Sequence, residues 1–256
     1  MNIYETDKLL AEYLLFHYGA PEEVLPYAFG PREALGYPQR CVTECLDVGS
    51  LPDRARALDL GCAVGRSTFE LARFCGEVVG IDYSARFIEA ARALQADGAL
   101  PYRRVDEGGL GAECRAVPPA EIDRTRVRFE TGDAMNLRAD LGRFDVVLMA
   151  NLIDRLRNPR LCLARLPGLV KTGGQLILTS PYTWLEEFTP RSQWLGGFER
   201  DGKAVATLDG LRAALEPHFD FVTARDLPFL IREHARKYQW SVAQATLWRR
   251  NSTGLS

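Results

Sequence analysis

Ala57-Leu58-Asp59-Leu60-Gly61-Cys62-Ala63-Val64-Gly65-Arg66-Ser67-Thr68 is the stretch of sequence that decides the fold of this chain. Its apolar first residues predict a buried strand, its glycines predict a tight turn, and its last residues predict the start of a helix. Ligands of open α/β sheets bind beyond the carboxyl ends of such strands. The turn after Leu60 is therefore the first candidate for a binding site.

An acidic residue, Asp59, lies two positions before the first glycine of this turn. Dinucleotide-binding turns have the pattern G-x-G-x-x-G, which brings backbone amides against a pyrophosphate. Here Ala63 occupies the position of the second glycine, and the carboxylate of Asp59 would repel a pyrophosphate. The pattern suits instead a cationic or zwitterionic ligand whose ammonium group can meet a carboxylate. S-adenosylmethionine is such a ligand.

Three more polar residues follow later predicted strands. Asp82 ends an apolar run 21 positions after Gly61, where an acid can bind both ribose hydroxyls of a nucleoside. Asp133 follows the predicted strand at 127–131, where its side chain can reach an adenine amino group. Asn151 follows the next strand, so we expect it at the same edge of the sheet and in contact with cofactor or substrate.

Taken in order and at these spacings, the four positions resemble the class I S-adenosylmethionine-dependent methyltransferases over about residues 40–250. The resemblance implies that S-adenosylmethionine is the cofactor. It also implies the cofactor-binding residues, which are Asp59, Gly61, Cys62, Gly65, Arg66, Asp82, Tyr83, Asp133, Ala134 and Asn151.

Alternating strand and helix patterns predict one α/β domain over residues 1–256. Strands are expected near 56–60, 77–82, 127–131, 144–149, 174–180, 218–224 and 240–248, and helices near 65–74, 84–96, 158–167 and 207–215. The expected fold is Rossmann-like, with a seven-stranded, mostly parallel sheet whose last strand is antiparallel, as the resembling family implies. An N-terminal helical cap over residues 1–48 includes helices at 5–18 and 38–48. Two insertions, 97–126 and 181–206, are expected near the site.

Composition narrows the classes of partner. The net charge is −2 with no basic block, so extensive phosphate contact with nucleic acid is not expected and a small-molecule substrate is favoured. The six cysteines form no C-x-x-C pair and there are three histidines, which argues against a structural zinc site and favours reduced thiols in a cytoplasmic protein. No signal peptide or membrane span is predicted.

Two further segments are more specific than the cofactor motif. Tyr4-Glu5-Thr6-Asp7-Lys8-Leu9-Leu10-Ala11-Glu12-Tyr13-Leu14-Leu15-Phe16-His17-Tyr18-Gly19 and Ser180-Pro181-Tyr182-Thr183-Trp184-Leu185-Glu186-Glu187-Phe188-Thr189-Pro190 resemble the methyltransferases that complete ovothiol biosynthesis. Together with the core motif, the likeness runs from about Tyr4 to Arg249. Because no synthase region precedes it, the chain is expected to be the stand-alone form.

This closer resemblance implies 5-thiohistidine as the acceptor and the π nitrogen of its imidazole as the methylated atom, which gives ovothiol A. Positioning must then decide between ring nitrogen and the softer sulfur. His17 and Tyr18 are the catalytic candidates, and His17 would accept a ring proton or orient the imidazole. The candidates for binding the substrate are Tyr4, Tyr13, Asn151, Arg155, Tyr182 and Trp184.

Alternative interpretations of each candidate remain open at this stage. His17 and Tyr13 also suit core packing, Arg155 suits a solvated helix start, and the aromatic insertion suits a satellite hydrophobic cluster. At the level of function, the alternatives are a class I methyltransferase for another small metabolite, a nicotinamide-dependent oxidoreductase and a non-catalytic module that binds S-adenosylmethionine. The missing glycine at Ala63 and the acid at Asp59 argue against the oxidoreductase.

Overall fold

A seven-stranded sheet lies at the centre of the computed structural model, which describes residues 5–253. In spatial order its strands are β10 (Phe219–His234), β11 (Lys237–Arg250), β7 (Val170–Ser180), β6 (Phe144–Ala150), β1 (Arg56–Leu60), β2 (Glu77–Asp82) and β5 (Val127–Thr131). From β7 to β5 neighbouring strands are parallel, whereas β11 runs antiparallel between β7 and β10. The predicted mostly parallel sheet with an antiparallel last strand is confirmed.

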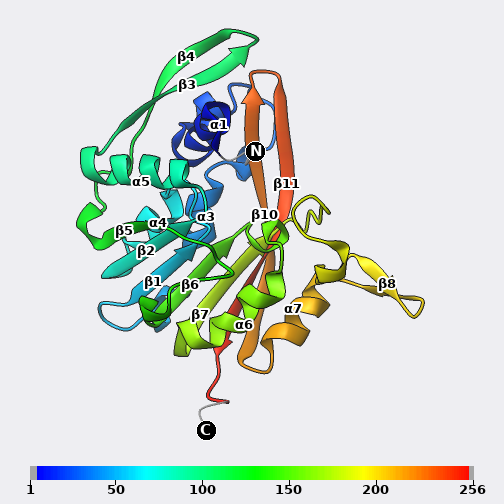
Figure 1. Ribbon diagram of the computed structural model, residues 1–256. Helices are drawn as coiled ribbons and strands as arrows, with labels where there is room; N and C mark the ends of the chain where they lie inside the picture. The colour runs from blue at the N-terminus through cyan, green and yellow to red at the C-terminus, as the bar shows by residue number, and fades with distance from the viewer. Residues whose placement is uncertain (1–4, 254–256) are drawn as a thin grey trace.

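Helices cover both faces of this sheet (Figure 1). The α-helices are α1 (Asp7–Tyr18), α2 (Pro21–Val24), α3 (Tyr37–Thr43), α4 (Arg66–Leu71), α5 (Ala85–Asp97), α6 (Pro159–Leu169) and α7 (Thr207–Leu215). Short 3-10 turns span Arg32–Ala34, Val48–Ser50, Arg124–Arg126, Ala139–Leu141, Ile153–Arg155 and Arg191–Gln193.

Strand residues alternate between two hydrophobic cores, one on each face. On β2, Val78 packs into the core that includes residues of α1, α3, α4 and α5, whereas Val79 packs into the core beneath α6 and α7. Both residues are fully buried, as expected for a parallel sheet that is covered on both sides. Both faces of the sheet are thus covered by packed side chains. Polar side chains line a cavity at its carboxyl edge.

The first insertion, 97–126, contains a β-hairpin that the sequence analysis did not predict. Its strands are β3 (Leu100–Glu107) and β4 (Leu110–Ala116), joined by Gly108 and Gly109. The hairpin packs on α1 and on β10 at one end of the molecule (Figure 1). A smaller hairpin in the second insertion pairs β8 (Phe198–Arg200) with β9 (Lys203–Val205).

Strands β10 and β11 are longer than the predicted 218–224 and 240–248. The two extensions reach past the sheet edge, and that of β10 packs on α1 (Figure 1). Rings make this contact: the centroid of Phe229 on β10 lies 6.2 Å from that of Phe16 on α1 and 4.8 Å from that of Tyr37 on α3. The carboxyl edge of the sheet is therefore enclosed by both ends of the chain.

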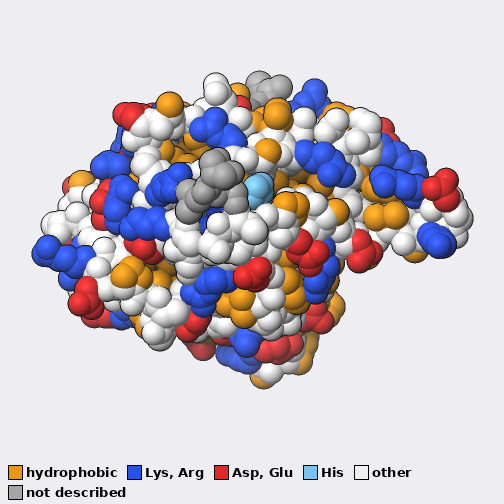
Figure 2. Space-filling view, turned by 90° about the horizontal axis from the view of Figure 1, so that it is seen from below, with side chains coloured by type: hydrophobic (Ala, Val, Ile, Leu, Met, Phe, Trp, Pro, Cys, Tyr) orange, Lys and Arg blue, Asp and Glu red, His pale blue; other side chains and the backbone are white. Residues whose placement is uncertain are grey.

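Figure 2 shows acidic and basic side chains mixed over one face of the molecule. Within residues 5–253, no helix is both long and apolar enough to cross a lipid bilayer.

Candidate functional site

The turn between β1 and α4 has the backbone that its glycines predict. Gly61 and Gly65 have φ angles of 81° and 88°, and a Cβ added at Gly65 would lie 2.6 Å from the ring of Phe129. Ala63 also has a positive φ, of 47°. Such backbone conformations are costly for residues with a side chain and are found where the chain must approach a ligand or another element closely. The amides of Gly61 and Cys62 donate to the carbonyl of Ile81, at 2.7 and 3.1 Å, which ties the turn to β2.

Asp82 links this turn to the end of β2. Its Oδ2 accepts a hydrogen bond from the amide of Ala63 at 2.9 Å, and its Oδ1 accepts one from the amide of Ser84 at 2.8 Å. Burial raises the pKa of the Asp82 carboxyl. The two hydrogen bonds hold the carboxylate in one orientation at the cavity wall and leave lone pairs for the hydroxyl groups of a ligand.

Asp59, on β1, is fully buried behind the turn. Its Oδ2 accepts hydrogen bonds from the hydroxyls of Ser67 and Thr68, both at 2.7 Å, while its buried Oδ1 has no partner among the described residues. Burial raises the pKa of this carboxyl from 3.8 to about 6. An ionised Asp59 is therefore a buried negative charge that a nearby cation would stabilise.

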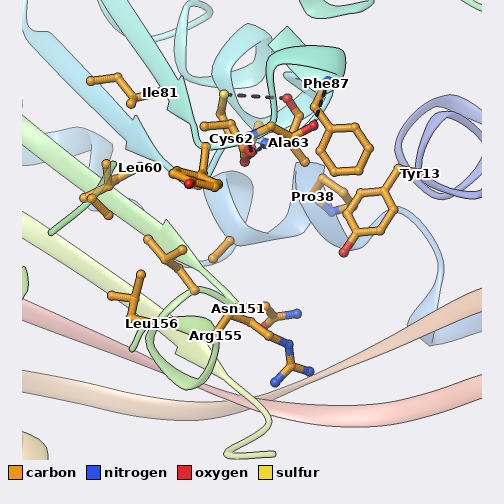
Figure 3. Close-up of a pocket in the computed structure, with 18 of the residues that line it drawn as sticks. Tyr13, Pro38, Leu60, Cys62, Ala63, Ile81, Phe87, Asn151, Arg155 and Leu156 are labelled. Carbon is orange, nitrogen blue, oxygen red and sulfur yellow. Dashed lines mark hydrogen bonds between the residues drawn. The ribbon is translucent and has the colours of Figure 1, made fainter. Parts of the chain in front are cut away.

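A cavity of about 430 Å³ opens at the carboxyl edge of the sheet. Its volume lies in the range of small-molecule sites. In Figure 3, Leu60 and Ile81 lie toward the sheet, Tyr13, Pro38 and Phe87 form one wall, and Asn151 and Arg155 lie opposite the Ala63 turn. The cavity thus joins the cofactor motifs to the N-terminal helices.

Most of the predicted site residues line this cavity. They are Tyr13, His17, Gly61, Cys62, Asp82, Tyr83, Asp133, Ala134, Asn151 and Arg155. Asp133 is oriented by the amide of Met135, which donates to its Oδ1 at 2.8 Å. Asp82 and Asp133 therefore lie on one surface, as the spacing of acids at successive strand ends predicts.

Other predicted residues do not line the cavity. Tyr4 lies outside the described residues. Gly65 shapes the turn, and Arg66 is turned into an ion pair with Glu70 at 2.7 Å and a hydrogen bond to Gln39 at 3.0 Å. Asp59 reaches the cavity only through Ser67, which is one of the lining residues.

The predicted aromatic contacts from the second insertion lie away from the cavity as well. Trp184 is 8% exposed, and its indole N–H donates to the hydroxyl of Thr207 at 2.9 Å. The hydroxyl of Tyr182 donates to Gln244 at 2.8 Å. Both side chains pack with the core beneath α6 and α7. The same insertion instead lines the cavity with Glu187 and Phe188.

His17 and Tyr18 occupy different environments although they are neighbours on α1. Tyr18 does not line the cavity, and its hydroxyl donates to the carbonyl of Val64 at 2.8 Å. Burial raises the pKa of Tyr18, so its hydroxyl keeps its proton. Through the hydrogen bond to Val64, Tyr18 supports the turn between β1 and α4. His17 faces the cavity beside Tyr13, with ring centroids 5.9 Å apart.

The imidazole of His17 is neutral near pH 7. Burial, followed by the charge of Arg66, lowers its pKa from 6.5 to about 3. Its Nδ1 is buried and has no partner among the described residues. A histidine with so low a pKa is a poor proton acceptor at neutral pH, so the low pKa favours the orienting role over the role of base.

Arg155 is held in place at the cavity by several contacts. Its Nη1 donates to Oδ2 of Asp154 and to the carbonyl of Thr183, both at 3.0 Å. Its guanidinium carbon lies 4.9 Å from the ring centroid of Phe188. Because these contacts engage one nitrogen and one face, the rest of the guanidinium can bind a carboxylate.

Several lining residues escaped the sequence analysis. The main ones are Phe16, Tyr37, Pro38, Ser67, Phe87, Arg157, Glu187, Phe188 and Ile231. Glu187 and Phe188 could have been predicted, because they belong to the insertion 181–206, which is expected near the site. Tyr37 follows a loose Gly- and Pro-containing segment, and Ile231 lies on the unpredicted extension of β10, so no periodic signal pointed to them.

The site fits a cofactor with a nucleoside and a positively charged end. Asp82 and Asp133 offer carboxylates to hydroxyl and amino groups, and the unpartnered Oδ1 of Asp59 adds negative charge behind the turn. The same carboxylates would repel the pyrophosphate of a dinucleotide. Within residues 5–253, no group of three or more His, Cys, Asp or Glu side chains is arranged to hold a metal ion.

Comparison with known proteins agrees with this geometry. Residues 58–178 match the family model described as "Methyltransferase domain". Over 128 residues the chain is 32% identical to a ubiquinone biosynthesis O-methyltransferase of Ruegeria sp. (strain TM1040), a match that covers 49% of this chain and 40% of that relative. The chain thus spans about two fifths of the length of that relative.

Solved structures share the fold. A SAM-dependent methyltransferase from Methanosarcina mazei superposes with a TM-score of 0.51 at 17% identity, and covers 79% of this chain and 95% of its own. A putative methyltransferase from Bacillus halodurans C-125 also gives 0.51, at 15% identity over 80% and 99% of the two chains. Residues 58–178 thus match a methyltransferase domain, and the two solved structures share the Rossmann-like fold of this chain.

Proposed function

We propose that this protein transfers a methyl group from S-adenosylmethionine to the imidazole π nitrogen of 5-thiohistidine, which yields ovothiol A. One observation carries the proposal. The two segments that resemble ovothiol-forming methyltransferases are more than 150 residues apart in the chain, yet both contribute to one cavity, through Tyr13 and His17 on one side and Glu187 and Phe188 on the other. The remaining wall carries the cofactor motifs.

The cofactor half of the site would be held by the ends of β1, β2 and β5. Asp82 would accept hydrogen bonds from ribose hydroxyls, Asp133 would accept one from the adenine amino group, and the Gly61 turn would contact the amino-acid end. When bound, S-adenosylmethionine supplies a sulfonium methyl group, whose bond to sulfur breaks with its electron pair retained by sulfur.

The acceptor half suits a small zwitterion with a flat ring. Arg155 would bind the substrate carboxylate with the part of its guanidinium that Asp154 and Thr183 leave available. The exposed carboxylate of Glu187 at the same cavity suits an ammonium group. Rings of Tyr13 and Phe87, whose centroids are 4.8 Å apart, offer an apolar surface against which an imidazole can stack.

The proton balance follows from the state of His17. The acceptor nitrogen must offer a lone pair, so it reacts in its unprotonated form and forms the new N–C bond with that pair. His17, with a pKa of about 3, does not hold a second ring proton at neutral pH. The ring proton of the acceptor is therefore released to solvent, while His17 orients the imidazole as a neutral hydrogen-bonding group.

A methyl-transfer assay tests the proposal. Purified protein is incubated with methyl-labelled S-adenosylmethionine and either 5-thiohistidine or histidine, and products are resolved by mass spectrometry and NMR. We expect methylation of the π nitrogen and a strong preference for the thiolated acceptor. Asp82→Ala is the matched negative control because it removes a cofactor contact and leaves the acceptor wall intact.

Two other outcomes would change the conclusion. Cofactor binding without transfer to either acceptor would refute the proposed substrate and leave the cofactor site in place. Transfer to an oxygen or sulfur atom of another small metabolite, in preference to 5-thiohistidine, would identify a different methyltransferase of the same family.

A further inference from the structure

Three side chains from distant parts of the chain meet in a hydrogen-bonded triangle at the end of β6. The hydroxyl of Tyr37, on α3, lies 2.6 Å from Oγ1 of Thr179 on β7 and 2.7 Å from Oδ1 of Asn151. The third side, from Oγ1 of Thr179 to Oδ1 of Asn151, measures 3.2 Å. Tyr37 and Thr179 are 2% and 1% exposed, so this triangle is shielded from solvent on the side away from the cavity.

The protons of the triangle fix the orientation of the Asn151 amide. Two hydroxyl groups bring two protons, and the two short sides share the Tyr37 hydroxyl, which is consistent with Thr179 donating to Tyr37 and Tyr37 donating to Asn151. Oδ1 of Asn151 is then the acceptor. The flipped amide would leave one of the two hydroxyl protons without an acceptor inside the triangle, which disfavours that assignment.

The backbone of Asn151 is equally constrained. Its amide donates to the carbonyl of Thr179 at 2.8 Å, and its φ angle is 51°, a left-handed conformation that asparagine tolerates better than most residues. Tyr37 is clamped between aromatic rings, 6.1 Å from Phe16 and 4.8 Å from Phe229 between centroids. Among the described residues no hydrogen bond engages Nδ2 of Asn151, and Asn151 lines the cavity beside the Leu152–Arg157 segment. Its two amide protons are therefore available to a ligand.

We propose that Tyr37 and Thr179 are positioning residues that hold Asn151 as a fixed hydrogen-bond donor to the sulfur of the acceptor, and that this contact directs methylation to the ring nitrogen. The inference rests on the proposed function, because it takes the acceptor to be a thiolate-bearing imidazole. A thiolate accepts hydrogen bonds and is the softer nucleophile of the substrate. An N–H donor that engages its lone pairs lowers its reactivity and keeps it off the line of attack, so the nitrogen forms the new bond.

The test measures where the methyl group goes. Asn151→Asp keeps the shape and the oxygen that accepts from Tyr37, but replaces the donor with a charge that repels a thiolate. We expect S-methylated product to appear beside the N-methylated one. The preference in kcat/KM for 5-thiohistidine over histidine should fall by at least about tenfold, mainly through KM for the acceptor. The Kd of S-adenosylhomocysteine, measured by calorimetry, should change by less than about threefold.

Tyr37→Phe removes the positioning hydroxyl without touching the donor, and it carries the test should Asn151→Asp fail to fold. We expect it to lower the same preference by about threefold to tenfold and to raise the S-methylated fraction. Tyr27→Phe is the matched control, because it removes a hydroxyl that donates to the carbonyl of Ala235 at 3.0 Å, outside the cavity. It should leave the product ratio unchanged.

The two possible failures are distinguishable. If wild-type protein methylates 5-thiohistidine on nitrogen and both variants keep the wild-type product ratio and acceptor preference, the inference about Asn151 is wrong and the proposed function stands. If the wild-type protein gives no transfer to 5-thiohistidine, the proposed function is wrong, and the sulfur contact is overturned with it.

Discussion

The buried charge of Asp59 makes the stability of the protein depend on pH in a direction opposite to that of most aspartates. Its pKa rises from 3.8 in the unfolded chain to about 6 in the folded protein. Because the folded state holds this proton to higher pH, the free energy of unfolding falls as pH rises from about 4 to about 6. At about 1.36 kcal/mol per pKa unit, the ionised carboxylate costs the folded protein about 3 kcal/mol at neutral pH.

Asp59→Asn removes this dependence. Asparagine keeps an oxygen for the hydroxyls of Ser67 and Thr68, and its amide nitrogen occupies the place of the unpartnered Oδ1. The unpaired amide has a cost of its own, but that cost does not vary with pH. We therefore expect the difference in unfolding free energy, variant minus wild type, to increase by about 2 kcal/mol between about pH 4.5 and about pH 7.5.

Urea unfolding of cofactor-free protein across this pH range measures the difference. Asp53→Asn, which removes an exposed carboxylate, is the control for the loss of one negative charge. A difference that stays constant with pH in Asp59→Asn would refute the reasoning. Calorimetry with S-adenosylhomocysteine adds a second reading: the affinity should fall, but by less than in Asp82→Ala, because Asp59 lies behind the cavity wall.

Four further substitutions separate binding, turnover and packing. Asp82→Ala should weaken the binding of S-adenosylhomocysteine by about 1.5–3 kcal/mol, since it removes charge-assisted hydrogen bonds; unchanged affinity in a folded variant would contradict the role of Asp82. His17→Ala should lower acceptor turnover more than cofactor affinity, and wild-type kinetics would instead identify His17 as a packing residue. Tyr18→Phe should cost about 1 kcal/mol of stability by removing the hydrogen bond to Val64, with turnover largely retained; loss of turnover in a stably folded variant would restore a catalytic role. Trp184→Phe should lower the melting temperature without changing KM for the acceptor, whereas a raised KM would show that Trp184 contacts substrate after all.

The positions of the proposed cofactor residues were predictable because parallel strands end at one edge of a sheet. Asp82 ends β2 and Asp133 follows β5, which runs parallel to β2, so both residues lie at the same edge of the sheet. The turn at Gly61 likewise follows from glycines that permit positive φ angles. The sequence pattern predicts where a side chain lies when the residue belongs to a regular strand or directly follows one.

The acceptor half was not predictable in the same way, because it depends on how irregular segments fold back. Nothing in the order Tyr182, Trp184, Glu187, Phe188 says which side chains turn to the cavity and which to the core beneath α7. The β3–β4 hairpin was predictable, since Gly108-Gly109 between two extended runs is a recognised signal for a tight hairpin turn.

The meeting of α1 with the extension of β10 has a consequence for how the protein is made. The wall that Phe16 and Tyr37 share with Phe229 joins two segments, the second of which leaves the ribosome long after the first. During synthesis the cofactor edge can take shape once β1, β2, β5 and β6 are out, and α1 can already pack on the β3–β4 hairpin. Its contact with Phe229 must wait until β10 is made. A nascent chain that ends before residue 219 would therefore lack Ile231 of the cavity lining and the ring contacts of Phe229, and completing the β10–β11 hairpin closes that part of the wall.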